Sequence, residues 1–330
     1  MANIPLTIAC GIYDRTRPIQ DGRVPVVGCD VTYLALPPEE IFFRAVKYAE
    51  FDVAELSLSS YIMEEARGDS NYIALPVPVS RVFRHSGVYI RTDRGISNPA
   101  DLKGKIVGIP EYQITAGLWM RGIFQDEHGV KPSDIRWRNG GQEEPGRVER
   151  ARLDLPADVE LETIPADKTL SEMLADGALD GLIAARAPSC FKNGAPHVGR
   201  LYPDYRAAEQ DYFRRTGLFH IMWVIGVRKS LVKQFPWLPT NVYRAFVEAK
   251  RIAIAGLEAI NALSVTLPWL GAEVEATREV MGEDYWPYGI EGNAKCIETM
   301  ARYAYEQGMT DRQMTVRELF AEQTFETAKV

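Results

Sequence analysis

The chain has 330 residues, of which 46% are hydrophobic and 25% are charged, and this composition excludes a disordered, collagen-like or disulfide-dense protein. With 38 basic and 45 acidic side chains the formal net charge is −7, so we expect no nucleic-acid partner, because phosphate binding requires a concentrated basic face. The length allows two domains or one large domain.

The first part of the chain alternates strands with helices. Residues 6–11 and 31–36 have the apolar character of strands, and apolar positions at helical spacing predict a helix over 39–50. Residues 51–58 predict a further strand, and the two serines at 59–60 suit the N-cap of a following helix. Alternation at this pace is typical of an α/β fold with a largely parallel sheet.

The middle of the chain repeats this alternation. The expected elements are strands at 85–91, 105–109 and 161–165, helices at 111–127 and 170–175, and a turn and strand at 177–184. Residues 139–158 are rich in glycine, proline and charge, and we expect them to form a surface loop.

The last third begins with a strand and then becomes helical. Residues 219–227 are almost continuously apolar, which indicates a strand buried on both faces. Apolar residues from Val242 to Ile260 recur on one helical stripe. Helices are also expected near 272–281, 293–307 and 315–325.

We expect a cytoplasmic protein without a membrane partner. The N-terminal segment has no basic start, no apolar core and no small-residue cleavage site, so a secretory signal is not expected. The most apolar long stretch, residues 252–272, is interrupted by Glu258 and Pro268, which argues against a membrane span. The four cysteines have no paired spacing, which is typical of reduced thiols.

Residues 85–109 resemble the start of the second lobe in type II periplasmic-binding-protein folds. The resemblance implies an α/β protein of two lobes with a central ligand cleft, between which the chain crosses twice, the second time near 219–221. It therefore predicts a discontinuous first lobe at 1–86 and 222–330, which includes the C-terminal helices, and a second lobe at 87–221.

A closer resemblance covers nearly the whole chain. Its sequence blocks lie at 13–16, 38–44, 50–61, 80–86, 107–113, 117–122, 281–289 and 306–308. In this order they resemble the 4,5-dihydroxyphthalate decarboxylase family. The chain departs from that family's pattern at two positions, where His220 and Trp223 stand in place of a proline and a histidine. Either His220 replaces the family histidine or the substrate differs.

The resemblance implies the conversion of 4,5-dihydroxyphthalate, a small aromatic dicarboxylate, to protocatechuate and CO2. It implies no organic cofactor, although a divalent metal could assist, and we expect a homo-oligomer. Ionising the hydroxyl para to the departing carboxylate pushes electron density to the carboxylate-bearing carbon, and an acid then protonates that carbon before CO2 leaves. The site therefore needs a base, an acid and cations. We expect the strong arginine contacts on the retained carboxylate, since clamping the departing group would stabilise the ground state.

Three residues are candidate catalytic groups. His85 titrates near neutral pH and suits an acid or a base. His220 lies in an apolar strand, where a histidine is equally well explained as a satisfied core residue. Glu111 suits a base toward the phenol, or else complements the dipole of the helix that it precedes.

The candidate substrate-binding residues are cationic or hydrogen-bonding groups near predicted strand ends. They are Arg15, Arg81, Arg84, Ser57, Ser59, Tyr112, Gln113, Thr115 and Arg186. Backbone N–H groups at the helix start after residue 111 favour an anion.

Each of these residue types also has a structural explanation. Arg15 could stabilise its lobe, and the basic residues at 81–85 could form a solvated loop. The serines could serve as helix caps. The aromatic cluster at 285–288 could wall the substrate or pack under the C-terminal helices. No zinc-type ligand spacing is present, so no metal site is assigned.

Two other functions remain open at this stage. The fold would serve a solute-binding protein for aromatic carboxylates that performs no catalysis. It would also serve the effector-sensing domain of a transcription factor, although no helix-turn-helix precedes it.

Overall fold

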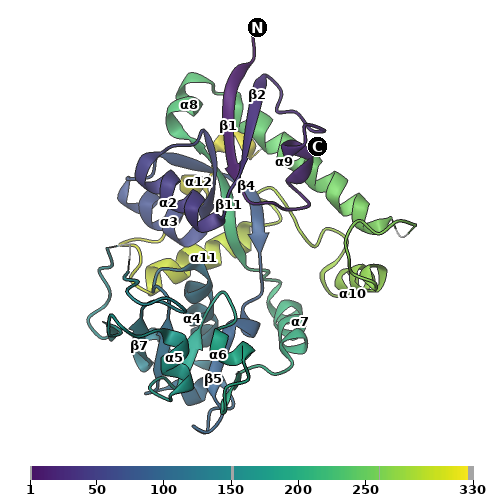
Figure 1. The fold of residues 1–330 in the computed structure, drawn as a ribbon. Helices are drawn as coiled ribbons and strands as arrows, with labels where there is room; N and C mark the ends of the chain where they lie inside the picture. Colours follow the sequence, from purple (N-terminus) through teal and green to yellow (C-terminus); the bar gives the residue numbers. More distant parts are fainter. Residues whose placement is uncertain (1, 150–151, 260, 326–330) are drawn as a thin grey trace. The chain divides into compact units, whose positions relative to one another are not determined.

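The computed structural model describes residues 2–149, 152–259 and 261–325, which fold into two compact units (Figure 1). Over the described residues, unit 1 comprises 2–81, 213–259, 261–298 and 314–325, and unit 2 comprises 82–149, 152–212 and 299–313. The sequence-based boundaries lay after residue 86 and before residue 222.

The segment 299–313, which the sequence analysis assigned to the first lobe, packs in unit 2. The ring of Tyr303 occupies the space that a side chain at Gly122 would need. Gln307 accepts a 2.7 Å hydrogen bond at Oε1 from Arg121 Nε. These contacts join residues far apart in the sequence, so no local pattern indicates them.

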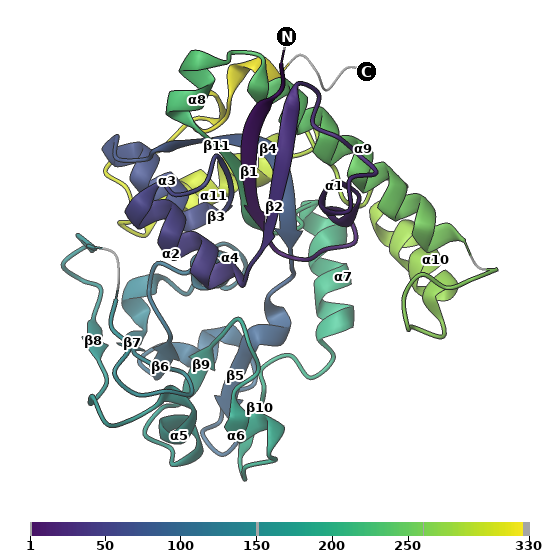
Figure 2. The ribbon, with the colours of Figure 1, turned by 45° about the horizontal axis from the view of Figure 1, so that its top comes forward.

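Unit 1 is built on a five-stranded sheet in the order β2-β1-β3-β11-β4 (Figure 2). Its strands are β1 (Ile4–Cys10), β2 (Cys29–Ala35), β3 (Val53–Ser57), β4 (Tyr72–Arg81) and β11 (Ile221–Arg228). β1 pairs in parallel with β2 and β3, whereas β11 runs antiparallel to β3 and β4. The parallel pairing brings the loops that follow β1 and β3 to the same edge of the sheet.

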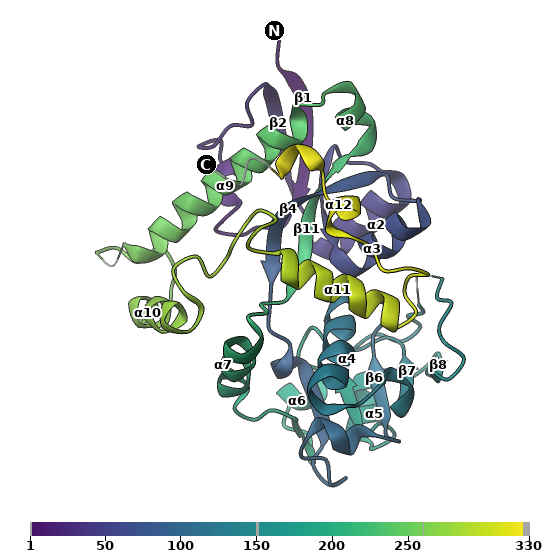
Figure 3. The same ribbon diagram turned by 180° about the vertical axis from the view of Figure 1, so that it is seen from behind.

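Helices cover both faces of this sheet (Figure 3). The helices of unit 1 are α1 (Arg17–Gln20), α2 (Pro38–Tyr48), α3 (Leu58–Arg67), α8 (Lys229–Gln234), α9 (Leu238–Glu258), α10 (Leu270–Met281), α12 (Val316–Leu319) and the 3₁₀ turn η4 (Glu322–Thr324). Helix α9 contacts β4, and its apolar stripe, including Val242 and Phe246, shares a hydrophobic core with Leu6 and Ile8 of β1. α2 and α3 contact β3 and lie on the other side of the sheet. Helix α11 (Ala294–Glu306) begins in unit 1 and ends in unit 2.

Two helix predictions in unit 1 are wrong in detail. Helix α3 begins at Leu58, and its N-cap residue Ser57 makes no side-chain capping hydrogen bond, so Ser59 lies inside the helix. The helix expected over 315–325 is only the short α12, because Phe320 leaves the helix to form a parallel bridge with Ala74 of β4.

Strand β4 is irregular where it faces β11. Trp223 pairs with Ser80 and Ile225 pairs with Leu75, so one residue of β11 faces residues 76–79 of β4. Two of these four residues are prolines, which have no backbone N–H to donate to a partner strand. The irregularity leaves backbone carbonyl groups of β4 available to side chains from other parts of unit 1.

Unit 2 is built on a six-stranded sheet in the order β10-β5-β9-β6-β7-β8. Its strands are β5 (Val88–Arg91), β6 (Ile106–Ile109), β7 (Arg136–Asn139), β8 (Leu161–Thr163), β9 (Gly181–Ile183) and β10 (Val198–Arg200). Its helices and 3₁₀ turns are η1 (His85–Gly87), η2 (Pro99–Leu102), α4 (Thr115–His128), η3 (Pro132–Asp134), α5 (Leu170–Ala175), α6 (Ser189–Lys192) and α7 (Tyr205–Thr216), which runs on into unit 1.

Two expected elements of unit 2 begin later than predicted. Residues 85–87 form the turn η1, so the strand begins only at Val88. The helix expected from 111 begins at Thr115. The described residues of 140–158 contain no helix or strand, as expected for a loop. None of the described helices is long and apolar enough to cross a lipid bilayer.

Candidate functional site

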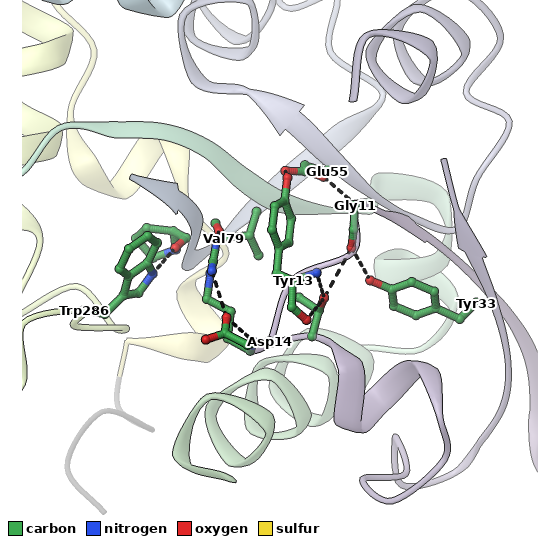
Figure 4. Close-up of polar contacts among 10 residues, drawn as sticks. Gly11, Tyr13, Asp14, Tyr33, Glu55, Val79 and Trp286 are labelled. Atoms are coloured by element: carbon green, nitrogen blue, oxygen red, sulfur yellow. Dashed lines mark hydrogen bonds and ion pairs between the residues drawn. The ribbon is translucent and has the colours of Figure 1, made fainter. Parts of the chain in front are cut away.

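A buried carboxylate holds the loop after β1 against β3. Glu55 lies in β3 with 0% of its surface exposed. Its Oε2 accepts a 2.9 Å hydrogen bond from the Gly11 backbone N–H, and its Oε1 accepts a 2.8 Å hydrogen bond from the Tyr13 hydroxyl (Figure 4). Burial raises the pKa of the Glu55 carboxyl, and the two hydrogen bonds oppose this rise. The pair fixes the position of the Tyr13 ring.

Arg15 lies in the same loop, between two aromatic rings. Its guanidinium carbon is 4.4 Å from the centroid of the Tyr13 ring and 4.3 Å from that of the Trp286 ring. Nε donates a 2.7 Å hydrogen bond to the Val79 carbonyl, to which Nη2 also donates, and Nη1 donates a 3.1 Å bond to Asp14 Oδ1. These bonds use three of the five N–H groups of a guanidinium. Stacking and hydrogen bonds therefore orient Arg15, and two of its N–H groups have no acceptor among the described residues.

The irregular part of β4 also fixes the aromatic segment that contains Trp286. Trp286 Nε1 donates a 2.8 Å hydrogen bond to the Pro78 carbonyl, and the Gly289 N–H donates a 2.8 Å bond to the Pro76 carbonyl. The carbonyl groups that β11 leaves unpaired thus hold Trp286 over Arg15.

Arg81, at the end of β4, is turned to internal contacts. Only 5% of its surface is exposed. Its Nη1 donates a 2.7 Å hydrogen bond to the Phe219 carbonyl, and its Nη2 donates to Asn293 Oδ1 and, at 3.3 Å, to the Pro287 carbonyl. Burial lowers the pKa of Arg81 to about 10. These contacts agree with a structural role, and direct substrate binding by Arg81 stays a prediction.

The remaining candidates of unit 1 lie around the same sheet. His220 precedes β11 and has 0% of its surface exposed. Ser57 ends β3 and is half-buried, and Ser59 is fully buried in the first turn of α3. Their roles in substrate binding or catalysis stay predictions.

In unit 2, His85 lies in a buried pocket of aromatic rings. Its Nδ1 is 4.0 Å from Glu209 Oε1, and its ring centroid lies 5.1 Å from those of Tyr202 and Tyr212. Burial raises the pKa of Glu209 to about 7. A carboxyl that titrates near neutral pH beside an imidazole is a pair suited to proton transfer.

Arg84, next to His85, is half-buried at the same end of unit 2. Its Nη1 donates a 3.3 Å hydrogen bond to the Ala185 carbonyl. Burial lowers the pKa of Arg84 to about 10, and the nearby charge of Glu209 opposes this. The neighbouring Arg186 is exposed, and its carbonyl accepts a 3.2 Å bond from Gln142 Nε2.

Glu111 is held in an internal ion pair. Its Oε1 accepts a 2.7 Å bond from Arg147 Nε and lies 2.5 Å from Arg147 Nη2, and its Oε2 accepts a 3.1 Å bond from Gln113 Nε2. The partner Arg147 comes from the loop that the sequence predicted over 139–158. This pairing agrees with a structural role for Glu111, and its action as a base stays a prediction.

The backbone N–H groups before α4 do receive an anion, but it belongs to the chain itself. Glu149 Oε2 accepts a 2.6 Å hydrogen bond from the Tyr112 N–H. Burial raises the pKa of Glu149, and the charge of Glu111 adds to the rise. The internal carboxylate occupies the place where the sequence suggested a ligand, beside the buried Thr115.

Among the described residues, a cavity of about 500 Å³ lies in unit 2. Its lining includes Asn139, Glu149 and Thr163 together with apolar residues between 153 and 161, but no basic side chain. This lining does not suit a doubly negative ligand. The described part of the chain also holds no group of three or more His, Cys, Asp or Glu side chains placed to bind a metal ion.

The comparison with known proteins covers the whole chain. It is 46% identical over 330 residues to a 4,5-dihydroxyphthalate decarboxylase of Comamonas testosteroni, and the match spans 100% of both chains. The chain belongs to the 4,5-dihydroxyphthalate decarboxylase family. A second member, from Pseudomonas putida, is 52% identical over 214 residues, which are 65% of this chain and 83% of that one. The family resemblance in the sequence is confirmed, although no protein-family model matches the chain.

Solved structures confirm the fold expected for this decarboxylase family member. The sulfonate-binding protein SsuA of Methylobacillus flagellatus superposes with a TM-score of 0.56 at 13% identity, over 99% of this chain and 94% of that one. SsuA of Escherichia coli superposes with a TM-score of 0.52 at 14% identity, over 97% of this chain and 92% of that one. The desulfurization enzyme DszB, solved with biphenyl-2-sulfinic acid, superposes with a TM-score of 0.54 at 15% identity, over 99% of both chains. At these identities the likeness shows the periplasmic-binding-protein fold alone.

Several residues that shape these sites were absent from the sequence-based list. They are Tyr13, Glu55, Glu149 and Glu209, whereas Trp286 belongs to the aromatic cluster that the sequence offered at 285–288. The signal for Glu55 was a lone acid inside an apolar strand, since a buried charge requires partners. Tyr13, Glu149 and Glu209 gave no comparable local signal.

Proposed function

We propose that this protein removes CO2 from 4,5-dihydroxyphthalate and releases protocatechuate. The observation that carries the proposal is the 46% identity over the full chain to a protein of that name. The 4,5-dihydroxyphthalate dianion and one proton give the protocatechuate monoanion and CO2. The reaction therefore needs no electron donor or acceptor. No organic cofactor is therefore required by the balance of the reaction.

In this proposal Arg15 binds the carboxylate that stays on the ring. Its planar group has two N–H donors to spare, and its position is fixed by Tyr13, Trp286 and the Val79 carbonyl. A preformed cation binds a carboxylate without the entropic cost of ordering a long side chain.

Proton transfer is assigned to the histidines. His85 has the better-supported position, because Glu209 lies 4.0 Å from its Nδ1 and can hold or release a proton near neutral pH. His220 is the second candidate and is fully buried. Protonation of the carboxylate-bearing carbon gives a dienone, from which CO2 leaves as the ring regains aromaticity. The cytoplasmic location and the homo-oligomer stay predictions.

The test is turnover by the purified protein. We expect CO2 release and protocatechuate formation from 4,5-dihydroxyphthalate, measured by gas evolution and by chromatography of the product. Phthalate, which has no hydroxyl to ionise, serves as the control and should not be decarboxylated. Binding of hydroxylated phthalates or benzoates without turnover, with or without divalent metal, would instead support a solute-binding protein.

A further inference from the structure

Tyr288 belongs to the aromatic segment that is attached to β4, two residues after Trp286, whose ring centroid lies 4.3 Å from the Arg15 guanidinium carbon. Its ring packs against the hydrophobic core of unit 1. Its hydroxyl oxygen is fully buried and has no hydrogen-bond partner in the part of the chain that the structure describes. A buried hydroxyl without a partner is unfavourable, and native structures rarely tolerate one unless it serves a ligand or a water.

Hydrogen bonds to β4 fix the segment around Tyr288. The segment is attached to β4 on both sides of Tyr288, by Trp286 Nε1 to the Pro78 carbonyl and by the Gly289 N–H to the Pro76 carbonyl. Arg81 Nη2 adds a 3.3 Å hydrogen bond to the Pro287 carbonyl. The orientation of Tyr288 therefore follows from the contacts of its neighbours rather than from a bond of its own.

The surroundings of the hydroxyl are rich in donors and positive charge. Lys250 Nζ lies 5.2 Å from the centroid of the Tyr288 ring. Burial raises the pKa of Tyr288, and the charges of Cys10 and Asp14 add to the rise, whereas those of Arg15 and Arg81 oppose it. The phenol therefore keeps its proton at neutral pH and acts as a donor. Arg81 Nε is a second buried donor without a partner among the described residues. Arg15 contributes its two unused N–H groups.

An anion with several acceptor oxygens would satisfy these groups together. We propose that the Tyr288 hydroxyl is a substrate-binding group that donates a hydrogen bond to the carboxylate held by Arg15. This assignment deepens the proposed function and rests on it for the identity of the substrate. A carboxylate has about four lone-pair sites, enough for the arginine and the phenol at once.

The test removes one oxygen atom. Tyr288→Phe keeps the ring and removes a buried hydroxyl without unpairing any other described group, so its melting temperature should equal or exceed that of the wild type. Its Kd for phthalate, measured by calorimetry, should rise about tenfold, the usual effect of losing a hydrogen bond to a charged group. With 4,5-dihydroxyphthalate, KM should rise by a similar factor and kcat should change little.

Tyr72→Phe is the matched control, because the Tyr72 hydroxyl has an internal partner, the Phe51 carbonyl at 2.8 Å. We expect this variant to melt at a lower temperature and to bind phthalate as the wild type does. Unchanged phthalate affinity in Tyr288→Phe, a loss of its thermal stability, or no phthalate binding by the wild type would overturn the assignment. Phthalate binding that depends on Tyr288, without any turnover of the hydroxylated substrate, would overturn the proposed function alone.

Discussion

The Tyr13 hydroxyl donates a 2.8 Å hydrogen bond to the Glu55 carboxylate, which has no exposed surface. This bond connects the core of the unit 1 sheet to the ring on which Arg15 stacks. The buried Glu55 thus positions Arg15 through the Tyr13 ring, since no described hydrogen bond joins Glu55 to Arg15 directly.

Replacing Tyr13 by phenylalanine should destabilise the protein by about 1–3 kcal/mol, because Glu55 Oε1 loses its donor. The folded-state pKa of Glu55 is already raised, and the loss of a donor to its ionised form raises it further. A raised carboxyl pKa lowers stability as pH increases. Urea unfolding should therefore show that Tyr13→Phe loses more unfolding free energy, relative to the wild type, at pH 8 than at pH 5. An equal loss at the two pH values would contradict this prediction.

Replacing Arg15 by lysine should raise KM at least tenfold, because an ammonium group neither stacks as a plane nor presents a fork of donors. The control is Arg23→Lys, since Arg23 is exposed and pairs only with Asp21 at 2.7 Å in the described ion pairs. Steady-state kinetics should give the wild-type KM for the control Arg23→Lys. A wild-type KM in Arg15→Lys would remove Arg15 from substrate binding.

Replacing His85 or His220 by asparagine should lower kcat by about 10²–10⁴-fold if that residue transfers the proton. The far-ultraviolet circular dichroism spectrum should stay unchanged for His85→Asn, which reports an intact fold. The other two histidines, His128 and His197, provide the matched control substitutions. Full activity in both His85→Asn and His220→Asn would exclude histidine from the mechanism.

Replacing Glu209 by glutamine should change the dependence of stability on pH. The pKa of Glu209 is raised from 4.5 to about 7 in the folded protein, so the wild type loses stability as pH rises through this interval. The raised pKa of Glu209 lowers the free energy of unfolding by at most about 3 kcal/mol over this interval. Unfolding free energies measured from pH 4.5 to 7 should fall less steeply in Glu209→Gln. An identical slope would show that the folded protein does not perturb this carboxyl.

Much of the fold could be predicted from the sequence, because strands and helices leave a local periodicity. The continuous apolar run at 219–227 predicted the interior strand β11, and the stripe after Val242 predicted α9. Arg15 was also identified, since it follows the first strand. Arg81 was predicted to bind the substrate and Glu111 to act as a base, and the structure gives both of them internal partners.

The sequence by itself determined the α/β character, the family and the residue types that can bind a dicarboxylate. Only the tertiary structure decided which of these residues have internal partners, as Arg81 and Glu111 do. Trp286 reaches the Pro78 carbonyl across 208 positions of sequence, and Glu55 reaches Tyr13 across 42. Periodicity reports only on neighbours within a few residues, whereas hydrogen-bond partners are chosen by the register of the sheet, which no local pattern encodes.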